Sequence, residues 1–261
     1  MSRDRKRPLK GPAGGVEYLS GIHSVTEALA AGRRRLHRLY VSKTGSDDRC
    51  RAAVIRAEAL GVPVASVGDE TLVQMAANSR HQGLCLQADP LPTLDLGQLA
   101  ALLETATSPP VVLMLDQITD PHNVGALLRT ALCTGVTVVV IAKDRSAGLS
   151  ASVSRVSAGA MEHVAVARVP NLSEAIRRLK GHGVWVAGLD RDQGSDIFDT
   201  SLPSPMALVV GSEGRGIRPL LKSRCDLLLA IPQQGRLNSL NASVAGAVAM
   251  YEIYRRRRAP S

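Results

Sequence analysis

Six short, almost purely apolar runs between Val111 and Ile231 constrain the fold of this chain more than any other feature. They read VVLML, VTVVVI, VAVARV, VWVAGL, MALVV and DLLLAI, and helical patterns separate most of them. Continuous apolar runs of this kind are typical of strands that are buried on both faces. The series therefore predicts an α/β domain over residues 111–258, with a parallel sheet covered by helices. Such sheets place ligands beyond the carboxyl ends of their strands, so the loops after the runs are candidate sites.

A smaller series of strands and helices precedes this domain. Between Tyr18 and Ala88, strands are expected in HRLYVS, VPVASV and GLCLQAD, and helices in IHSVTEALAAG, DDRCRAAVIRAEALG and DETLVQMAAN. This alternation predicts a small α/β domain over residues 16–88. Prolines at 90, 92, 109 and 110 bracket one further helix, so residues 89–110 are expected to connect the two domains. Residues 1–15 are expected to form a basic, disordered arm.

The charge of the chain favours a polyanionic partner. The formal net charge is +9, and basic residues cluster at Arg3–Lys10, Arg33–Arg38 and Arg255–Arg258. Lysine and arginine near phosphates release condensed counterions, which favours nucleic acid. A solvated basic surface without a partner is the alternative. Aromatic residues make up only 2% of the chain, which argues against binding through rows of stacked bases.

Other classes of protein fit the sequence poorly. No apolar run approaches the ~20 residues of a membrane span, and no apolar stretch follows the charged N-terminus as in a secretory signal. Four scattered cysteines contain no C-x-x-C pair, so neither a zinc site nor a disulfide framework is expected. These features predict a cytoplasmic protein with reduced cysteines and no membrane partner.

The first candidate loop contains DPHNVGALLRTA. Asp120 and Pro121 form a helix start, since Asp caps the helix and Pro suits the first helical position. Helix formation does not explain Asn123 in the first turn, nor Arg129 two turns later. Arg129 could reach toward the strand ends, or it could extend from a packed helix into solvent.

The second candidate loop contains LVVGSEGRGI. Gly211, Gly214 and Gly216 allow sharp turns and close approach to a ligand. Their spacing is neither the dinucleotide fingerprint nor a P-loop, so neither NAD nor a nucleoside triphosphate is indicated. Glu213 is either a residue that orients a ligand or an ordinary turn residue.

The third candidate loop opens the stretch IPQQGRLNSLNASVAGAVAM. Ser239 or Asn238 could cap the helix of small residues that follows. A cap explains one polar side chain and leaves the others unexplained, Asn241 among them.

Together the three segments resemble the three signature motifs of the SpoU/TrmH family of RNA ribose 2'-O-methyltransferases. The segment RVSAGAMEHV also resembles the family's intermediate segment. The first domain, which ends in SRHQGL, is similar to the ribosomal-protein-like substrate-binding domain of one branch. That branch contains a 23S rRNA guanosine 2'-O-methyltransferase and its mitochondrial counterparts. The resemblance implies a parallel sheet with a deep trefoil knot, binding of S-adenosylmethionine, and a homodimer whose sites use residues from both subunits.

The resemblance also implies roles for individual residues. Gly211, Ile231 and Leu240 match the positions that hold the cofactor. The polar catalytic group matches Asn123, Arg129, Glu213, Ser239 and Asn241. No metal is implied. Arg129 would either activate the 2'-hydroxyl or stay cationic, grip the adjacent phosphate and stabilise the developing alkoxide.

The expected function is S-adenosylmethionine-dependent methylation of a ribose, on a guanosine of large-subunit rRNA. RNA is the expected partner because only RNA carries a 2'-hydroxyl, and no DNA partner is expected. The alternatives are a tRNA ribose methyltransferase, an antibiotic-resistance methyltransferase of the same family, and a non-catalytic RNA-binding factor in ribosome assembly.

Overall fold

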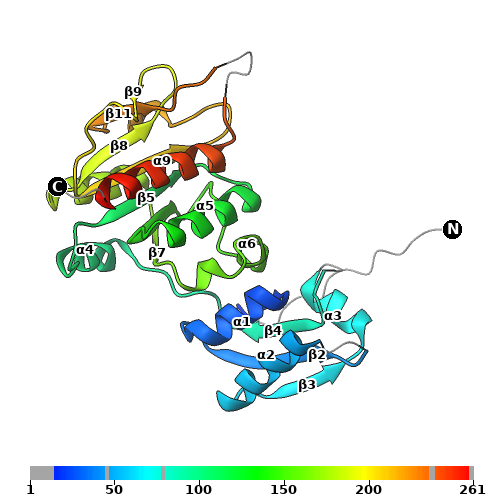
Figure 1. Cartoon of the computed structure of the whole chain (residues 1–261). Helices are drawn as coiled ribbons and strands as arrows, with labels where there is room; N and C mark the ends of the chain where they lie inside the picture. Colours follow the sequence, from blue (N-terminus) through cyan, green and yellow to red (C-terminus); the bar gives the residue numbers. More distant parts are fainter. Residues whose placement is uncertain (1–14, 45–46, 78–79, 235–238, 259–261) are drawn as a thin grey trace. The chain divides into compact units, whose positions relative to one another are not determined.

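The chain forms two compact units, each with its own sheet (Figure 1). The computed structural model describes residues 15–44, 47–77, 80–234 and 239–258. The first unit comprises Met1–Pro92 and Leu149–His163, and the second comprises Thr93–Gly148 and Val164–Ser261. In the described ranges, no helix combines the length and the apolar character needed to cross a bilayer.

The first unit contains a four-stranded mixed sheet. Its strand order is β1 (Glu17–Ser20), β4 (Leu84–Ala88), β2 (Leu36–Ser42), β3 (Val64–Val67). Strands β2 and β3 are parallel, and the other two pairs are antiparallel. The helices are α1 (Ile22–Ala31), α2 (Asp48–Ala59) and α3 (Asp69–Ala76). The predicted strands and helices of this unit are confirmed. Strand β1, only four residues long, was not predicted.

A segment from the middle of the chain completes the first unit. It contains α6 (Ala151–Val156) and the 3₁₀ helix η1 (Ala160–Glu162). Gly159 joins the two with φ 81°, and a Cβ there would lie 2.5 Å from Glu27 Cβ. Both the left-handed backbone and the close approach require glycine. The segment RVSAGAMEHV therefore bends tightly against α1.

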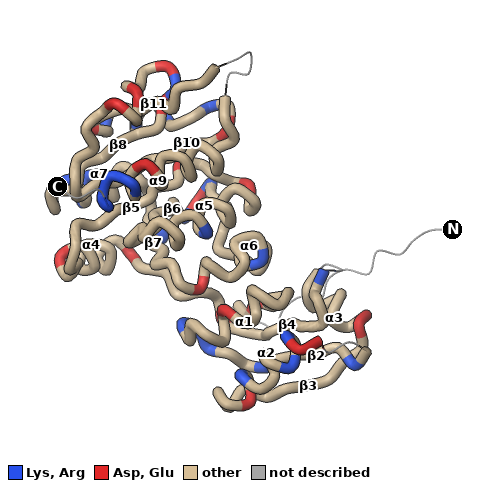
Figure 2. The backbone as a smooth tube through the Cα atoms, in the orientation of Figure 1, with Lys and Arg blue, Asp and Glu red and all other residues tan. Residues whose placement is uncertain are grey.

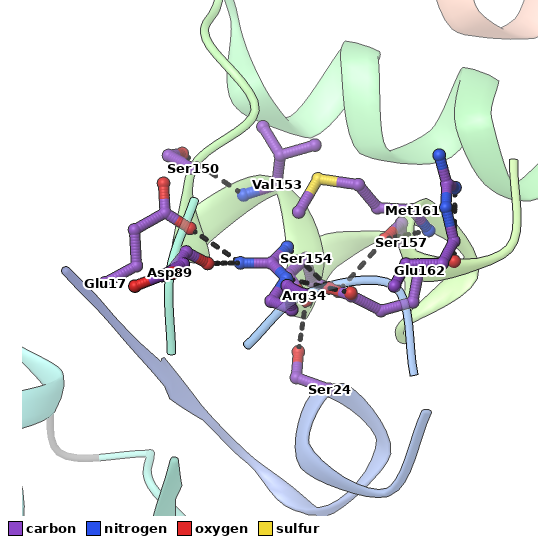
Figure 3. Close-up of polar contacts among 11 residues, drawn as sticks. Glu17, Ser24, Arg34, Asp89, Ser150, Val153, Ser154, Ser157, Met161 and Glu162 are labelled. Carbon is purple, nitrogen blue, oxygen red and sulfur yellow. Dashed lines mark hydrogen bonds and ion pairs between the residues drawn. The ribbon is translucent and has the colours of Figure 1, made fainter. Parts of the chain in front are cut away.

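A buried charged cluster fixes this segment in place (Figure 3). The Arg34 Nε and Nη2 atoms donate to the two carboxylate oxygens of Glu162, at 3.0 and 2.8 Å. Its Nη1 donates to Glu17 Oε2 at 2.9 Å and to the Asp89 carbonyl at 3.1 Å. The side chains of Arg34 and Glu162 are both 0% exposed. Burial raises the pKa of Glu162, although the guanidinium favours its ionised form.

The second unit contains a seven-stranded parallel sheet. Its order is β7 (Val166–Val169), β6 (Val138–Ala142), β5 (Val111–Asp116), β10 (Met206–Gly211), β8 (Trp185–Leu189), β11 (Leu227–Ala230), β9 (Ser195–Asp196). All six neighbouring pairs are parallel. The six apolar runs are six of these strands, as predicted. The two-residue strand β9 was not predicted, because it has no apolar pattern.

Helices cover both faces of this sheet. They are α4 (Leu96–Glu104), α5 (Pro121–Cys133), α7 (Leu172–Gly181), α8 (Pro219–Lys222) and α9 (Ala242–Arg258). Met114 of β5 and Val209 of β10 share one core cluster with residues of α4, α7 and α8. On the opposite face, Gly246 of α9 lies against Val210 of β10 and Leu127 of α5. A Cβ at Gly246 would lie 2.4 Å from Leu127 Cδ2, so this glycine permits close packing within the chain.

The segment expected to connect the domains packs into the second unit. Leu99 and Leu103 of α4 lie in its core cluster. Leu94 forms main-chain hydrogen bonds with Val166 and Arg168, both at 2.9 Å. The domain boundaries inferred from the sequence stay a prediction.

Two basic runs are partly engaged inside the protein, and the run at residues 3–10 lies outside the described residues. Arg34 belongs to the buried cluster. Arg256, in the basic C-terminal end of α9 (Figure 2), donates to Glu252 and to the carbonyls of Ile197, Phe198 and Thr200. Arg34 and Arg256 therefore bind groups within the fold, so their presence in a basic run is not evidence of a polyanion site.

Candidate active site

The second and third candidate loops line one cavity at the carboxyl ends of β8, β10 and β11, together with the loop that follows β8. Five of the eight residues suggested by the resemblance line it: Gly211, Glu213, Ile231, Ser239 and Leu240. This is the edge of a parallel sheet at which a ligand was expected. The cavity lining mixes apolar side chains such as Leu189, Val210 and Leu229 with charged ones.

Asn123, Glu213 and Asn241 form a hydrogen-bonded cluster beside the cavity. The Asn123 Nδ2 donates to Glu213 Oε1 at 2.8 Å. The Asn241 Nδ2 donates to Asn123 Oδ1 at 2.9 Å and also to Glu213 Oε1. Asn123 is buried, whereas Glu213 and Asn241 are exposed. One residue from each of the three loops thus meets in this cluster, which fixes the side chain of Glu213 at the cavity wall.

Asn241 also begins the last helix. Its Oδ1 accepts from the backbone N–H of Ser243 at 2.9 Å and from that of Val244 at 3.3 Å. The prediction that Ser239 or Asn238 caps α9 is therefore not supported for Ser239, and Asn238 lies outside the described residues. The side-chain carbonyl oxygen of Asn241 therefore caps α9, while its side-chain amide nitrogen donates to Asn123 and Glu213.

The first candidate loop starts helix α5 at Asp120 and Pro121, as predicted. Asp120 Oδ1 accepts from the backbone N–H of His122 at 2.9 Å, and Pro121 occupies the first helical position of α5. This cap fixes the first turn of α5 and so the position of Asn123.

The second candidate loop, called the glycine loop below (residues 211–218), is held by hydrogen bonds between its own main-chain atoms. Ser212 and Gly216 exchange two main-chain hydrogen bonds, at 3.2 and 2.8 Å. A Cβ at Gly211 would lie 2.1 Å from the carbonyl carbon of Gly216, so no larger residue fits there. Gly214 and Gly216 have φ of 75° and 63°, in the left-handed region that favours glycine. Backbone requirements thus account for all three glycines.

The loop after β8 adds charged residues that the sequence interpretation missed. Asp190 accepts from the backbone N–H groups of Asp192 and Gln193, at 3.0 and 2.9 Å, and pairs with Lys222. Burial alone would raise the pKa of Asp190, but Lys222 and these N–H groups hold it below its usual range. The signal that could have found Asp190 is its place directly after an apolar run.

Arg129 is not part of this arrangement within one chain. It is exposed on α5, and it neither lines the cavity nor joins the Asn123 cluster. Across the described ranges, its guanidinium has no hydrogen-bond or ion-pair partner. Six positions separate it from Asn123, so the two residues leave α5 in directions about 120° apart.

The cavity suits a small ligand with an apolar ring and charged groups. Its apolar lining can cover a ring, and three acidic and three basic side chains balance around it: Asp190, Asp192, Glu213, Arg191, Arg215 and Lys222. Ligand pockets commonly combine an apolar lining with a few polar groups that fix orientation. Among the described side chains, no group of three or more His, Cys, Asp or Glu is placed to hold a metal ion.

Comparison with known proteins identifies both units. The family model described as SpoU rRNA Methylase matches residues 110–251. The one described as RNA 2'-O ribose methyltransferase substrate binding matches residues 18–94. The 23S rRNA (guanosine-2'-O-)-methyltransferase RlmB of Coxiella burnetii is 39% identical over 246 residues, which cover 94% of this chain and 98% of that protein.

Two further proteins are similar to this chain, and they differ in sequence identity and in how much of their length is matched. A Synechocystis protein described as an uncharacterized tRNA/rRNA methyltransferase is 41% identical over 93% of this chain, which spans 63% of that protein's length. The solved SpoU methyltransferase AviRb of Streptomyces viridochromogenes, in complex with AdoMet, has a TM-score of 0.79 and 20% identity. The match covers 93% of this chain and 91% of AviRb. At that identity the similarity shows the fold alone.

Proposed function

The chain belongs to the SpoU family of RNA 2'-O-ribose methyltransferases, and from this membership we propose how its residues carry out that reaction. It is an S-adenosylmethionine-dependent enzyme that methylates ribose in rRNA, most like the enzymes that act on a guanosine of 23S rRNA. The observation that carries the proposal is that Asn123, Glu213 and Asn241, one residue from each motif, meet at the wall of one cavity.

We propose that this cavity holds S-adenosylmethionine. Gly211, Ile231 and Leu240 would bind it, largely through backbone groups, as in the family. Support comes from their position in the cavity wall and from the balance of apolar and charged lining residues. Such a cofactor would supply its sulfonium methyl group to the ribose 2'-hydroxyl oxygen in an in-line displacement: the methyl–sulfur bond breaks as the methyl–oxygen bond forms, and S-adenosylhomocysteine leaves.

The chain's own residues then have to orient the ribose and handle the hydroxyl proton. We propose that Asn123, Glu213, Ser239 and Asn241 form the polar wall against which the ribose is aligned. The hydrogen bonds among Asn123, Glu213 and Asn241 support this, because they hold the Glu213 carboxylate in one position. No metal is needed for such an alignment role.

Arg129 is proposed to act from the second subunit of a homodimer. A guanidinium is a poor general base, because it does not give up its proton in proteins. We therefore assign it to gripping the phosphate beside the ribose and stabilising the developing alkoxide. Its exposure on α5, away from the cavity of its own chain, supports a role in the partner's site.

An apolar surface on α9 supports the homodimer. Val244 and Tyr251 are 47% and 51% exposed, and nearby Phe198 is 45% exposed. Ala247 and Val248 extend the same surface. Contiguous exposed apolar residues of this kind mark interaction sites.

Mixed dimers test the placement of Arg129. One chain carries Arg129→Ala and the other carries Glu213→Gln, each with its own tag, and both are expected to be inactive alone. If Arg129 serves the partner's site, each mixed dimer keeps one complete site. When the two chains pair at random, about half of the dimers are mixed. Each mixed dimer has one complete site out of two, so about a quarter of the wild-type activity is expected. An inactive mixture, with mixed dimers verified by tandem purification, would place both residues in the same subunit's site.

The target nucleotide is tested in cells. Mapping 2'-O-methyl groups in the rRNA of a deletion strain should reveal one lost methylation on a 23S guanosine. A lost methylation on tRNA would favour the tRNA alternative instead. Calorimetry with S-adenosylmethionine separates both from a non-catalytic assembly factor, for which no binding is expected.

Two finer expectations accompany this proposal. We propose that the second unit carries the family's deep trefoil knot, and that the enzyme works in the cytoplasm, where rRNA is processed. Membership in the SpoU family supports both. We also propose that the first unit, whose family model is a substrate-binding one, has the ribosomal-protein-like fold of the branch and contacts the RNA.

A further inference from the structure

Asp116, the last residue of β5, has a carboxylate that is completely buried. Arg218 supplies three contacts to it. The backbone N–H of Arg218 donates to Oδ2 at 2.9 Å, Nε donates to Oδ1 at 2.8 Å, and Nη2 lies 2.7 Å from Oδ1. A buried carboxylate is tolerated when it is paired and hydrogen-bonded in this way.

The two residues meet at the base of the glycine loop. The loop starts at Gly211, which pairs with Asp116 in the parallel ladder between β10 and β5. It ends at Arg218, the residue before α8, whose backbone and side chain bind the same Asp116. Asp116 therefore holds both ends of the loop, and the hydrogen bonds between Ser212 and Gly216 close it in between.

This loop forms one wall of the cavity. Residues 211–216 all line it, and Glu213 within them accepts hydrogen bonds from Asn123 and Asn241. Neither Asp116 nor Arg218 lines the cavity. The Arg218 side chain is 40% exposed, whereas Asp116 is fully buried. Loss of the guanidinium would thus release the loop on its solvent side while the strands beneath remain packed.

We propose that Asp116 and Arg218 are positioning residues that hold the glycine loop in the conformation that binds S-adenosylmethionine. They act through Gly211–Gly216 and touch neither cofactor nor RNA. The proposal rests on the proposed function, in which this cavity takes the cofactor. If the pair sets the fraction of molecules with a binding-competent loop, the apparent dissociation constant rises as that fraction falls.

Three variants and a control test this by calorimetry with S-adenosylmethionine and by urea unfolding. Arg218→Met keeps the backbone N–H and removes the cation, and Arg218→Lys keeps the charge without the fork. Arg224→Met is the control, because Arg224 is an exposed arginine a few residues away. We expect Arg218→Met to raise the dissociation constant about tenfold or more, as the competent fraction falls to a tenth or less. Arg218→Lys should give a smaller rise, and Arg224→Met none.

A double variant separates positioning from mere stability. Arg218→Met leaves the Asp116 carboxylate buried without its partner, which also lowers stability. Asp116→Asn combined with Arg218→Met removes that buried charge, so stability should recover while affinity stays weak. Recovery of affinity together with stability would overturn the proposal, and so would unchanged affinity in Arg218→Met. If the wild-type protein itself binds no S-adenosylmethionine, the proposed function fails instead.

Discussion

Two arginine–carboxylate pairs of this molecule share one chemistry and differ in their surroundings. In the first unit, Arg34 and Glu162 are both fully buried, and the guanidinium also binds Glu17 and the Asp89 carbonyl. In the second unit, only the carboxylate of the Asp116–Arg218 pair is buried. The fully buried Arg34–Glu162 pair, called the sealed pair below, can only stabilise the fold, because no ligand can approach it. The Asp116–Arg218 pair is partly exposed and lies at the base of the glycine loop, so it can also affect how a ligand binds in the cavity.

The largest expected effect comes from breaking the sealed pair. Arg34→Met removes the guanidinium that pairs with both Glu162 and Glu17. Loss of one partner of a buried pair costs about 3–5 kcal/mol. We expect the free energy of unfolding of the first unit to fall by that order, measured by urea titration and circular dichroism. Arg35→Met is the matched control, since Arg35 is exposed in the same basic run.

That experiment also checks the interpretation of the basic run. If Arg34→Met proved as stable as Arg35→Met, the buried cluster would contribute nothing and the first unit would not depend on it. A further variant, Arg34→Met with Glu162→Gln, should regain part of the loss, because it removes one buried charge.

A smaller effect on stability is expected at the open cavity. Asn241→Ser keeps a side chain that can cap α9, but it loses the amide that donates to Asn123 and Glu213. Stability should stay close to the wild type, while methyl transfer falls. Asn241→Ala should lose the cap as well, at about 1 kcal/mol.

Methyl-transfer assays and urea unfolding of these two variants check this separation. Equal activity of Asn241→Ser and wild type would show that the cluster serves only the helix start.

The last effect is confined to acid conditions and concerns a third pair, at the end of α9. Hydrogen bonds from Arg255 lower the pKa of Glu252 to about 2 against the effect of burial, with help from Arg256. Because the folded-state value lies below the unfolded one, this stabilisation is complete above pH ~4.5 and is lost as the pH falls toward ~2.

Glu252→Gln should therefore flatten the fall in unfolding free energy between these pH values. Glu58→Gln, at an exposed residue of α2, is the control. If Glu252→Gln left the acid profile unchanged, the pair would contribute less than its buried carboxylate indicates.

Local patterns predicted most of the fold. The apolar runs gave six strands of the parallel sheet, and Asp120 with Pro121 gave the start of α5, because periodicity and caps depend on neighbouring residues. The two missed strands, β1 (EYLS) and β9 (SD), contain no continuous apolar run. The motif residues of the cavity were expected from the family resemblance, whereas Asp190 and Lys222 were not.

Long-range pairing could not be predicted in the same way. Nothing near Glu162 in the sequence shows that its partner is Arg34, 128 positions away. The run around Arg34 was interpreted as charge for a polyanion, yet this member of it is buried. Asn241 was expected at the site through the resemblance, but its capping role depends on where α9 begins.

The path of the chain has a consequence for how the protein is made. The sheet of the first unit is synthesised early, yet the segment Leu149–His163 that completes it emerges only after β5, α5 and β6. Until then the nascent polypeptide carries Arg34 without Glu162, its buried partner. During translation, the first unit can therefore complete its fold only after much of the second unit's sequence has been synthesised. A gene fragment ending at Pro92 would encode an unfinished product.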